Sequence, residues 1–474
     1  MLRKEFCRKN RDKGIHGISF KHILIIICCA LFITISIPQK SWAFLDFIRR
    51  ISQNAAQTSR GNTVIAIGEQ PTDTTFNPAL GSFITQNMNG MDDSLEAYYM
   101  FAETDFHFRY TGTNGKRYTT KGTDSFALLP ELAYLHHVKD SPMTWGLNFY
   151  VPDGFLVDYS YNTKYFGGMK THTKLVHYRF GPFLSYQITP ELSVGARIAA
   201  DYANFNLALP FGIAFFNTGD MYGWGASTTI GLAYKPNEHL QFGLFYDDTF
   251  MQGTAEPKNR DGDIKMCTTP VTNGVGSPYR DFNDIDIEIR NLDFPRSFGF
   301  GMAYMPTPSW RFSADIKYYM WDEDWDKLTL KIKSADFAAA NPRGTDKIFL
   351  PLSIDNQMPI SVGVEYFFGD IYRIGVGYHY MDIAMDNDQF MPSVPTTVDH
   401  FISAGLTIKP SDSVKIDFAL GVGLMDDGKI KTSSYDRSLE KQLGLPAGSM
   451  DSEYNNSRPN YTEYNFELGF TVFW

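Results

Sequence analysis

The last nine residues of the chain are Phe466-Glu467-Leu468-Gly469-Phe470-Thr471-Val472-Phe473-Trp474. Apolar side chains stand at every second position from Phe466 to Trp474, and a period of two places them on one face of a β-strand. The opposite face carries smaller or polar residues, with Phe473 as the exception. A strand that alternates in this way and ends the chain on an aromatic residue is typical of bacterial outer-membrane β-barrels. We therefore expect the barrel assembly machinery to bind the strand that ends at Trp474.

The same alternation recurs on both sides of short polar turns at 139–142, 189–191, 235–237, 306–308, 369–370 and 410–412. Longer polar connections separate these hairpins, at 113–122, 153–173, 209–221, 256–283, 321–346, 385–395 and 429–459. This rhythm of short turns and long loops is typical of a transmembrane barrel. A secreted β-sandwich or propeller would show the alternation, but neither the rhythm nor the terminal aromatic strand.

The alternation predicts fourteen strands, at about 96–112, 123–137, 143–152, 174–188, 192–208, 222–235, 240–255, 286–305, 310–320, 347–368, 371–384, 397–408, 414–427 and 461–474. An even number of strands brings both ends of the barrel to the periplasmic side. We predict an all-β fold, a 14-stranded antiparallel transmembrane β-barrel over residues 93–474. The outer membrane of a Gram-negative cell is the expected location.

The amino-terminal 43 residues have the pattern of a secretory signal. Residues 1–22 are basic, residues 23–37 form an uncharged apolar run, and Ser41 and Ala43 are the small residues that a signal peptidase requires. We predict a signal peptide over 1–43 that is cleaved after Ala43. An uncleaved membrane anchor is the alternative.

Charge and cysteine content exclude several classes of protein. Residues 1–43 hold eight basic and two acidic residues, so the rest of the chain holds 35 basic and 51 acidic ones, a net charge of −16. Binding to duplex nucleic acid is therefore not expected. Cys267 is the one cysteine after the signal, and the sequence predicts no disulfide, metal or cofactor. Acidic clusters in the long loops are either a solvated rim or Ca²⁺ ligands that bridge lipopolysaccharide phosphates.

Residues 44–92 precede the first strand and do not alternate. Their first eight residues, 44–51, have the pattern of a short amphipathic helix. A barrel of this size has a lumen too wide for its own side chains to fill. We therefore predict that residues 44–92 fold into the lumen as a hatch, or plug.

Four motifs carry a resemblance to a known family. They are Asn77-Pro78-Ala79, the run 145–154, the Gly-Asp…Gly-Trp-Gly run 219–225, and residues 292–297 followed by 314–315. In this order they resemble the FadL/TodX family of outer-membrane transport proteins for long-chain fatty acids and other hydrophobic compounds. The resemblance covers nearly the whole mature chain and identifies Asn77, Pro78 and Ala79 as the motif of the hatch. The chain departs from the family in residues 52–70, where the family's hatch is usually richer in glycine and small residues, and in the unusually long, polar loop 429–459.

An apolar stretch stands where an outer loop is expected. Its apolar residues are Leu207, Leu209, Phe211, Ile213, Phe215 and Phe216. Exposed apolar patches usually mark binding sites, and the resemblance implies that this loop, with 256–283, captures the ligand. The alternative is a loop that packs into the mouth of the barrel without a ligand.

A carboxylate ligand would need a cation in the lumen. Alternation points Arg179, Arg197, Lys317 and Arg373 inward, and the resemblance implies that such cations hold the headgroup. The alternative is that each pairs with a lumen acid such as Asp315 or Glu365. Pro152 lacks an N–H and Gly154 lacks a side chain. The resemblance implies an inward kink there that opens a lateral exit, whereas the alternative is a strand that simply ends.

The sequence thus favours a monomeric, non-enzymatic barrel that takes up hydrophobic molecules passively. Expected partners are fatty acids or aromatic hydrocarbons, lipopolysaccharide and outer-membrane lipid. A general porin or an adhesin is the main alternative. An outer-membrane phospholipase is another, suggested by His136-His137 near Ser141, but these residues would lie at a periplasmic turn.

Overall fold

The computed structural model describes residues 45–46, 48–112, 115–122, 125–163, 165–211, 214–251, 254–257, 260–267, 279–290, 292–323, 325, 327–341, 343–352, 354–382, 384–385, 398–425, 434–448 and 454–474. The predicted signal peptide and its cleavage after Ala43 lie outside these residues. Among the residues described, no helix is both long enough and apolar enough to cross a membrane.

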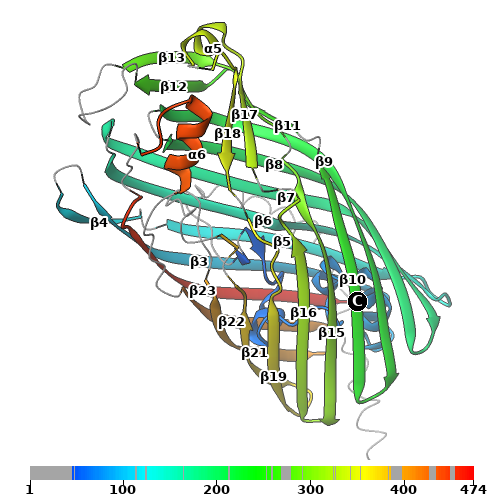
Figure 1. Ribbon diagram of the computed structural model, residues 1–474. Helices are drawn as coiled ribbons and strands as arrows, with labels where there is room; N and C mark the ends of the chain where they lie inside the picture. Colours follow the sequence, from blue (N-terminus) through cyan, green and yellow to red (C-terminus); the bar gives the residue numbers. More distant parts are fainter. Residues whose placement is uncertain are drawn as a thin grey trace, which may run out of the picture. The chain divides into compact units, whose positions relative to one another are not determined.

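Fourteen long strands of the described chain pair in sequence order and form a closed antiparallel barrel (Figure 1). The ring closes because β23 pairs with both β22 and β3. The strands are β3 (Asp93–Thr111), β5 (Ser125–His137), β6 (Met143–Thr163), β7 (Gly167–Thr189), β8 (Leu192–Phe211), β9 (Ala214–Asn237), β10 (Leu240–Met251), β15 (Phe294–Thr307), β16 (Trp310–Met320), β19 (Ile360–Phe368), β20 (Tyr372–Tyr380), β21 (His400–Ser411), β22 (Val414–Leu424) and β23 (Arg458–Phe473). The predicted fold is confirmed.

The two faces of the strands differ as a transmembrane barrel requires. On β16, Phe312 and Ile316 are exposed on the outer wall, whereas Asp315 and Lys317 are buried in the lumen. The same change of face from residue to residue recurs around the barrel, and it places apolar side chains toward lipid.

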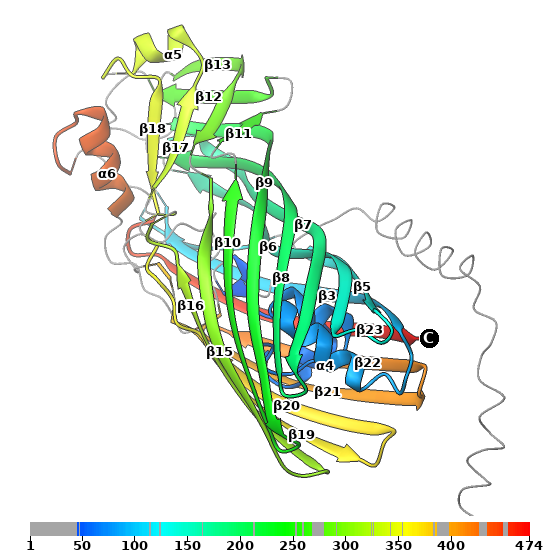
Figure 2. The same cartoon turned by 90° about the vertical axis from the view of Figure 1, so that its right-hand side faces the viewer.

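Residues 48–84 lie inside the barrel and are buried almost throughout. They form α3 (Ala55–Ser59), η2 (Pro71–Thr75), η3 (Pro78–Leu80) and the start of α4 (Gly81–Gln86), drawn in blue within the ring of strands in Figure 2. Glycines of the wall permit the close approach. A Cβ at Gly363 would stand 2.1 Å from the carbonyl oxygen of Arg60, and one at Gly243 would stand 2.0 Å from that of Ile65.

The helix predicted over 44–51 is wrong. The described part of this segment is a strand pair, β1 (Leu45–Asp46) with β2 (Arg49–Arg50), and Arg49 pairs in turn with Asp153 of β6. Arg49 bonds Asp153, whereas Arg50 bonds Glu131 of β5. Consecutive side chains reach different partners because extended backbone turns them to opposite sides.

Four further predicted segments differ from the observed ones. The predicted strand 347–368 is two strands, β18 (Lys347–Pro351) and β19, and the predicted strand 286–305 divides into β14 (Ile287–Arg290) and β15. The predicted loops 153–173 and 209–221 are mostly strand, because β6–β7 and β8–β9 continue as paired hairpins to Thr163↔Gly167 and Phe211↔Ala214.

Additional strands stand at the end of the barrel with the long connections, which is the outer end. They include β4 (Arg117–Lys121), β11 (Thr254–Pro257), β12 (Gly262–Cys267), β13 (Tyr279–Ile285) and β17 (Lys327–Ile332). Strands β11, β14, β17 and β18 pair in that order, and we call them the outer sheet. Helices α5 (Ala335–Ala340) and α6 (Ser434–Leu443) lie in the same region (Figure 2).

Candidate functional site

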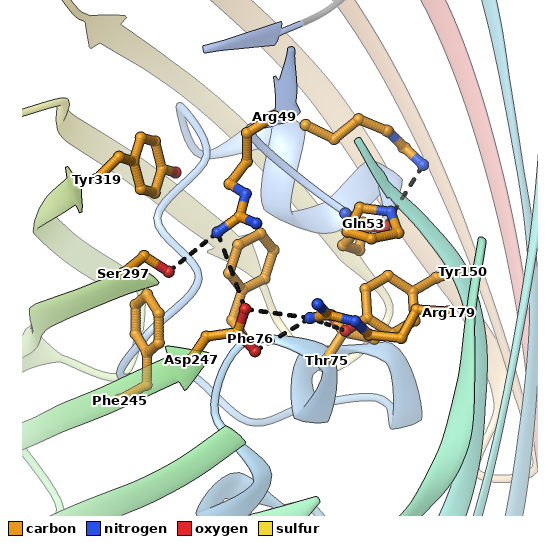
Figure 3. Close-up of a pocket in the computed structure, with 12 residues that line it drawn as sticks. Arg49, Gln53, Thr75, Phe76, Tyr150, Arg179, Phe245, Asp247, Ser297 and Tyr319 are labelled. Atoms are coloured by element: carbon orange, nitrogen blue, oxygen red, sulfur yellow. Dashed lines mark hydrogen bonds and ion pairs between the residues drawn. The ribbon is translucent and has the colours of Figure 1, made fainter. Parts of the chain in front are cut away.

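A small internal pocket lies where the N-terminal segment meets the barrel wall (Figure 3). Its free volume is about 30 Å³, enough for one or two water molecules. A larger ligand therefore requires the lining to move. The lining residues are Arg49, Arg50, Gln53, Thr75, Phe76, Tyr150, Pro152, Arg179, Phe245, Asp247, Ser297 and Tyr319.

Arg49 is one of two cations that the N-terminal segment contributes to this pocket, and the other, Arg50, is paired with Glu131. The Nε of Arg49 donates to Asp153 over 2.9 Å, and its Nη1 donates to the hydroxyl of Ser297 over 3.1 Å. Its Nη2 is buried and has no hydrogen-bond partner among the described residues. A buried charged donor without a partner is costly, so this nitrogen is available to an anionic ligand.

Arg179 and Arg197, two of the predicted lumen cations, meet at one carboxylate. Arg179 lies 3.0 Å from Asp247 and 2.7 Å from Asp201, and Arg197 lies 3.5 Å from Asp247. Both guanidinium groups stand over the ring of Tyr150. The sequence left open the alternative that the inward cations pair with acids of the lumen. In the structure, Arg179 and Arg197 do form such pairs.

His177 of β7 links the pocket to β6, and no sequence motif pointed to this histidine. Its Nδ1 lies 2.7 Å from Asp153 and its Nε2 lies 2.6 Å from Asp201, while Phe294 stacks on its ring at 4.1 Å. A ring that is protonated on both nitrogens donates to both carboxylates, whereas a neutral ring donates to only one. The site then has four cations for three carboxylates. These are Arg49, Arg179, Arg197 and His177 with Asp153, Asp201 and Asp247.

The other two predicted cations lie elsewhere. The ammonium of Lys317 donates to the carbonyl of Ile51 over 3.3 Å and stands 4.6 Å from the ring centre of Phe76. Arg373 belongs to a separate group of charges around Glu69, with Glu365 at 3.2 Å. The structure thus brings together Arg179 and Arg197, but not all four predicted residues.

The barrel wall is interrupted beside the pocket. The ladder between β5 and β6 ends at Leu132↔Phe149, although β5 stays paired with β3 as far as Thr104↔Ser125. The register of β6 against β7 shifts between Tyr150 and Asp153, which brackets Pro152. On the inner side, the amide of Gly154 donates to the carbonyl of Ile48 over 2.9 Å. Strand β2 therefore covers β6 where its ladder with β5 has ended.

The Asn-Pro-Ala motif fastens the N-terminal segment to strands β8 and β9 of the wall. The amide of Asn77 donates to the carbonyls of Ile65 and Leu232 over 2.9 and 3.1 Å. Its side-chain oxygen caps η3 by accepting from the amide of Ala79. A Cβ at Gly195 would stand 2.4 Å from Pro78 and Ala79, so the motif requires a glycine on β8.

The apolar residues predicted for ligand capture are not on an exposed loop. Leu207 and Leu209 belong to β8, Phe215 and Phe216 belong to β9, and all four side chains are buried. Leu207, Leu209 and Phe216 belong to one large apolar cluster that also holds Trp321 and the inner face of the outer sheet. Phe215 contacts Phe166, which packs against the same cluster. The side chain of Phe211 and the whole of Ile213 lie outside the described residues.

The long connection between β22 and β23 covers this cluster. Tyr435 and Leu439 of α6 pack into it, and Gln442 bonds both the amide and the carbonyl of Phe349 in β18. Farther along the connection, the hydroxyl of Tyr454 donates to the carbonyl of Pro210 over 3.2 Å. The outer mouth is therefore closed over the apolar residues.

A closed 14-stranded barrel with an apolar outer face and a filled lumen is the architecture of an outer-membrane barrel protein. The family model for outer membrane transport proteins, OMPP1/FadL/TodX, matches residues 53–457. The chain therefore belongs to this family.

Individual relatives are distant. The long-chain fatty acid transport protein of Escherichia coli O6:H1 is 22% identical over 213 residues, which are 44% of each chain. The chain thus matches less than half the length of this curated relative. Among solved structures, the toluene transporter TodX of Pseudomonas putida has a TM-score of 0.67 at 17% identity, covering 90% of this chain and all of that one. A Pseudomonas aeruginosa FadL homologue has a TM-score of 0.67 at 15% identity, covering 90% and 99%. These structures share the fold.

Proposed function

We propose that this protein carries hydrophobic carboxylates, long-chain fatty acids in particular, passively across the outer membrane. The observation that carries the proposal is the surplus cation beside the internal pocket, together with the unpartnered Nη2 of Arg49. One carboxylate headgroup would balance the charge and accept that hydrogen bond. The name of the Escherichia coli relative agrees with such a ligand, whereas that of TodX points to toluene. A neutral hydrocarbon would leave the surplus charge unbalanced.

We further propose that the ligand leaves sideways between β5 and β6. The loss of ladder bonds after Leu132↔Phe149 and the shifted register around Pro152 support an opening there. Residues 44–92 act as the hatch, because residues 48–84 fill the lumen and bind the wall on several sides. A filled lumen also disfavours a general porin. The strand that ends at Trp474 remains the proposed signal for barrel assembly.

Replacing Arg49 with glutamine should weaken oleate binding by about 1.5–3 kcal/mol, the scale of a charge-assisted hydrogen bond. Oleyl alcohol, which has the same chain without the charge, should bind Arg49→Gln and the parent equally. Ser297→Ala serves as the control, because it removes a neutral partner of Arg49 from the same pocket. Calorimetry in detergent measures the binding of oleate and of oleyl alcohol to the parent, to Arg49→Gln and to Ser297→Ala. An equal loss for acid and alcohol would mean that the pocket changed shape, and unchanged oleate binding would remove Arg49 from the site.

The closed outer mouth implies that capture requires the β22–β23 connection to open. Tyr454→Phe removes the hydroxyl that bonds Pro210 and Tyr161. Each such bond contributes a net of about 0.5–1.5 kcal/mol, so opening becomes easier and initial uptake at low ligand concentration should rise a few-fold. Tyr464→Phe, on the exposed outer face of β23, is the matched control. Uptake by Tyr454→Phe at or below the parental rate would contradict a gating role.

A further inference from the structure

The outer sheet has one apolar and one basic face. Alternate residues of β17 and β18 are buried, namely Leu328, Leu330, Ile332, Ile348 and Leu350, and they pack into the apolar cluster of the outer mouth. The opposite face and the residue that follows β17 carry Arg290, Lys327, Lys331, Lys333 and Lys347, with Glu288 as the acidic member. Among the described residues, five cations on this face thus stand against two acids, Glu288 and Asp286, the residue before β14, which lies 3.6 Å from Arg260. The net charge of the whole protein is −10.

The cations of this basic face are not balanced from within the protein. Lys331 stands directly opposite Lys347 across the ladder, and like charges at such positions destabilise a sheet. Glu288, on the other side of Lys331, is already bound by Arg290 over 2.8 Å and by Lys333. Partial burial opposes its ionisation, but these two cations outweigh it and hold the pKa of Glu288 below its ordinary value.

Three lysines of the face are left for an external anion. Among the described residues, Lys327, Lys331 and Lys347 form no ion pair with a protein carboxylate. Side chains two residues apart on a strand lie on the same face about 7 Å apart, so Lys327 and Lys331 are separated by about twice that distance. The face thus offers positive charge along a line of roughly 13 Å.

The position of the sheet indicates which anion it meets. Strand β17 follows β16 in the chain, β18 precedes β19, and both stand above these two barrel strands (Figure 1). The outer wall below them exposes apolar side chains, among them Ile316, Met358 and Ile360. Because the apolar face of the sheet turns toward the mouth, the basic face turns away from it, over the lipid that surrounds β16 and β19.

We propose that this basic face binds the phosphate groups of lipopolysaccharide in the outer leaflet. Phosphates on sugars at the membrane surface stand at the level of a sheet that rises directly from the lipid-facing wall. Several lysines near an anionic lipid surface act together, and salt weakens the attraction. The partner relieves the unfavourable Lys331–Lys347 contact, and it holds the outer sheet upright beside the mouth.

The test compares two triple variants refolded without lipopolysaccharide. Lys327→Gln, Lys331→Gln and Lys347→Gln together remove the free cations of the basic face. Lys139→Gln, Lys235→Gln and Lys409→Gln remove the same charge from periplasmic turns. Titration with purified lipopolysaccharide, followed by native mass spectrometry, should show at least about 10-fold weaker binding for the first variant. The control should bind like the parent, and heat-modifiable gels show that both are folded.

Two further titrations identify the partner. Lipopolysaccharide treated with a phosphatase should bind the parent protein as weakly as untreated lipopolysaccharide binds the basic-face variant. Soluble polyphosphate should bind the parent more weakly than lipopolysaccharide. Equal binding by the two triple variants would overturn the proposal. It would also be overturned if phosphate removal had no effect, or if polyphosphate bound as tightly as the lipid.

Discussion

Oxidation of a variant with Arg49→Cys and Asp153→Cys should reduce uptake of a labelled fatty acid by at least about 10-fold, and a reductant should restore it. Arg49 and Asp153 are antiparallel partners. The neighbouring Gly154–Ile48 hydrogen bond makes theirs a non-hydrogen-bonded pair, with Cα atoms about 4.5 Å apart. That separation suits a disulfide. The bond would hold β2 against β6 at the wall break and keep the exit closed.

The comparison between oxidised and reduced protein controls for the lost side chains. The two replacements remove one positive and one negative charge, so the balance of the site is unchanged. Cys267→Ser in the background removes the buried native cysteine. Uptake that is equal in both redox states would exclude movement of β2 from the transport cycle.

A second lock distinguishes the lateral route from an axial one. The hydroxyl oxygens of Ser82 in α4 and Ser185 in β7 lie 2.8 Å apart, so cysteines at these positions can also be joined with little movement. This bond fastens the N-terminal segment to the wall away from the break. Lateral exit predicts normal uptake when Ser82→Cys and Ser185→Cys are oxidised. An axial path past the hatch predicts the opposite result. The disulfide between positions 82 and 185 should then stop uptake, and the disulfide between positions 49 and 153 should not.

The barrel strands could be predicted from the sequence because the membrane imposes a local pattern. Each strand has one face toward lipid and one toward the lumen, so a period of two marks it without knowledge of its neighbours. The outer sheet has the same period, which is why the prediction merged β18 with β19 and β14 with β15. The sequence pattern does not distinguish a strand in the membrane from one that stands above it.

The partners in the site could not be predicted in the same way. Alternation indicates that Arg179 and Arg197 face the lumen, where the structure shows them buried. Their shared partner, Asp247, comes from another strand, and the cation Arg49 comes from a segment predicted as a helix. Periodicity assigns a face to each residue, but it contains no information on which strands bring two residues together. His177 was missed because a single histidine in a strand has no distinctive spacing.

Glu69 connects the N-terminal segment to three strands of the wall. Its carboxylate bonds Arg311 of β16 over 2.7 Å and also bonds Arg373 of β20. Lys415 of β22 lies 3.8 Å away, and Arg60 of the segment itself lies 3.9 Å away. Glu365 is a second acid that binds both arginines. Four cations thus surround Glu69, namely Arg60, Arg311, Arg373 and Lys415. Glu69 is the acid that the N-terminal segment contributes to this group of charges.

Replacing Glu69 with glutamine should therefore release the segment rather than unfold the barrel. Leaving Arg311 and Arg373 without this partner should cost roughly 3 kcal/mol, the low end for a broken buried ion pair, because Glu69 is partly exposed. Conductance of small ions through planar bilayers should rise in Glu69→Gln and stay at the parental level in Glu191→Gln, on an exposed periplasmic turn. Adding Arg373→Gln to Glu69→Gln removes one of the cations that lost its carboxylate partner. The double variant should therefore conduct ions less than Glu69→Gln alone. If the conductance of Glu69→Gln equals that of the parent, the ion pairs of Glu69 do not hold the hatch in place. The apolar and backbone contacts, which the parent and Glu69→Gln share, would then hold it alone.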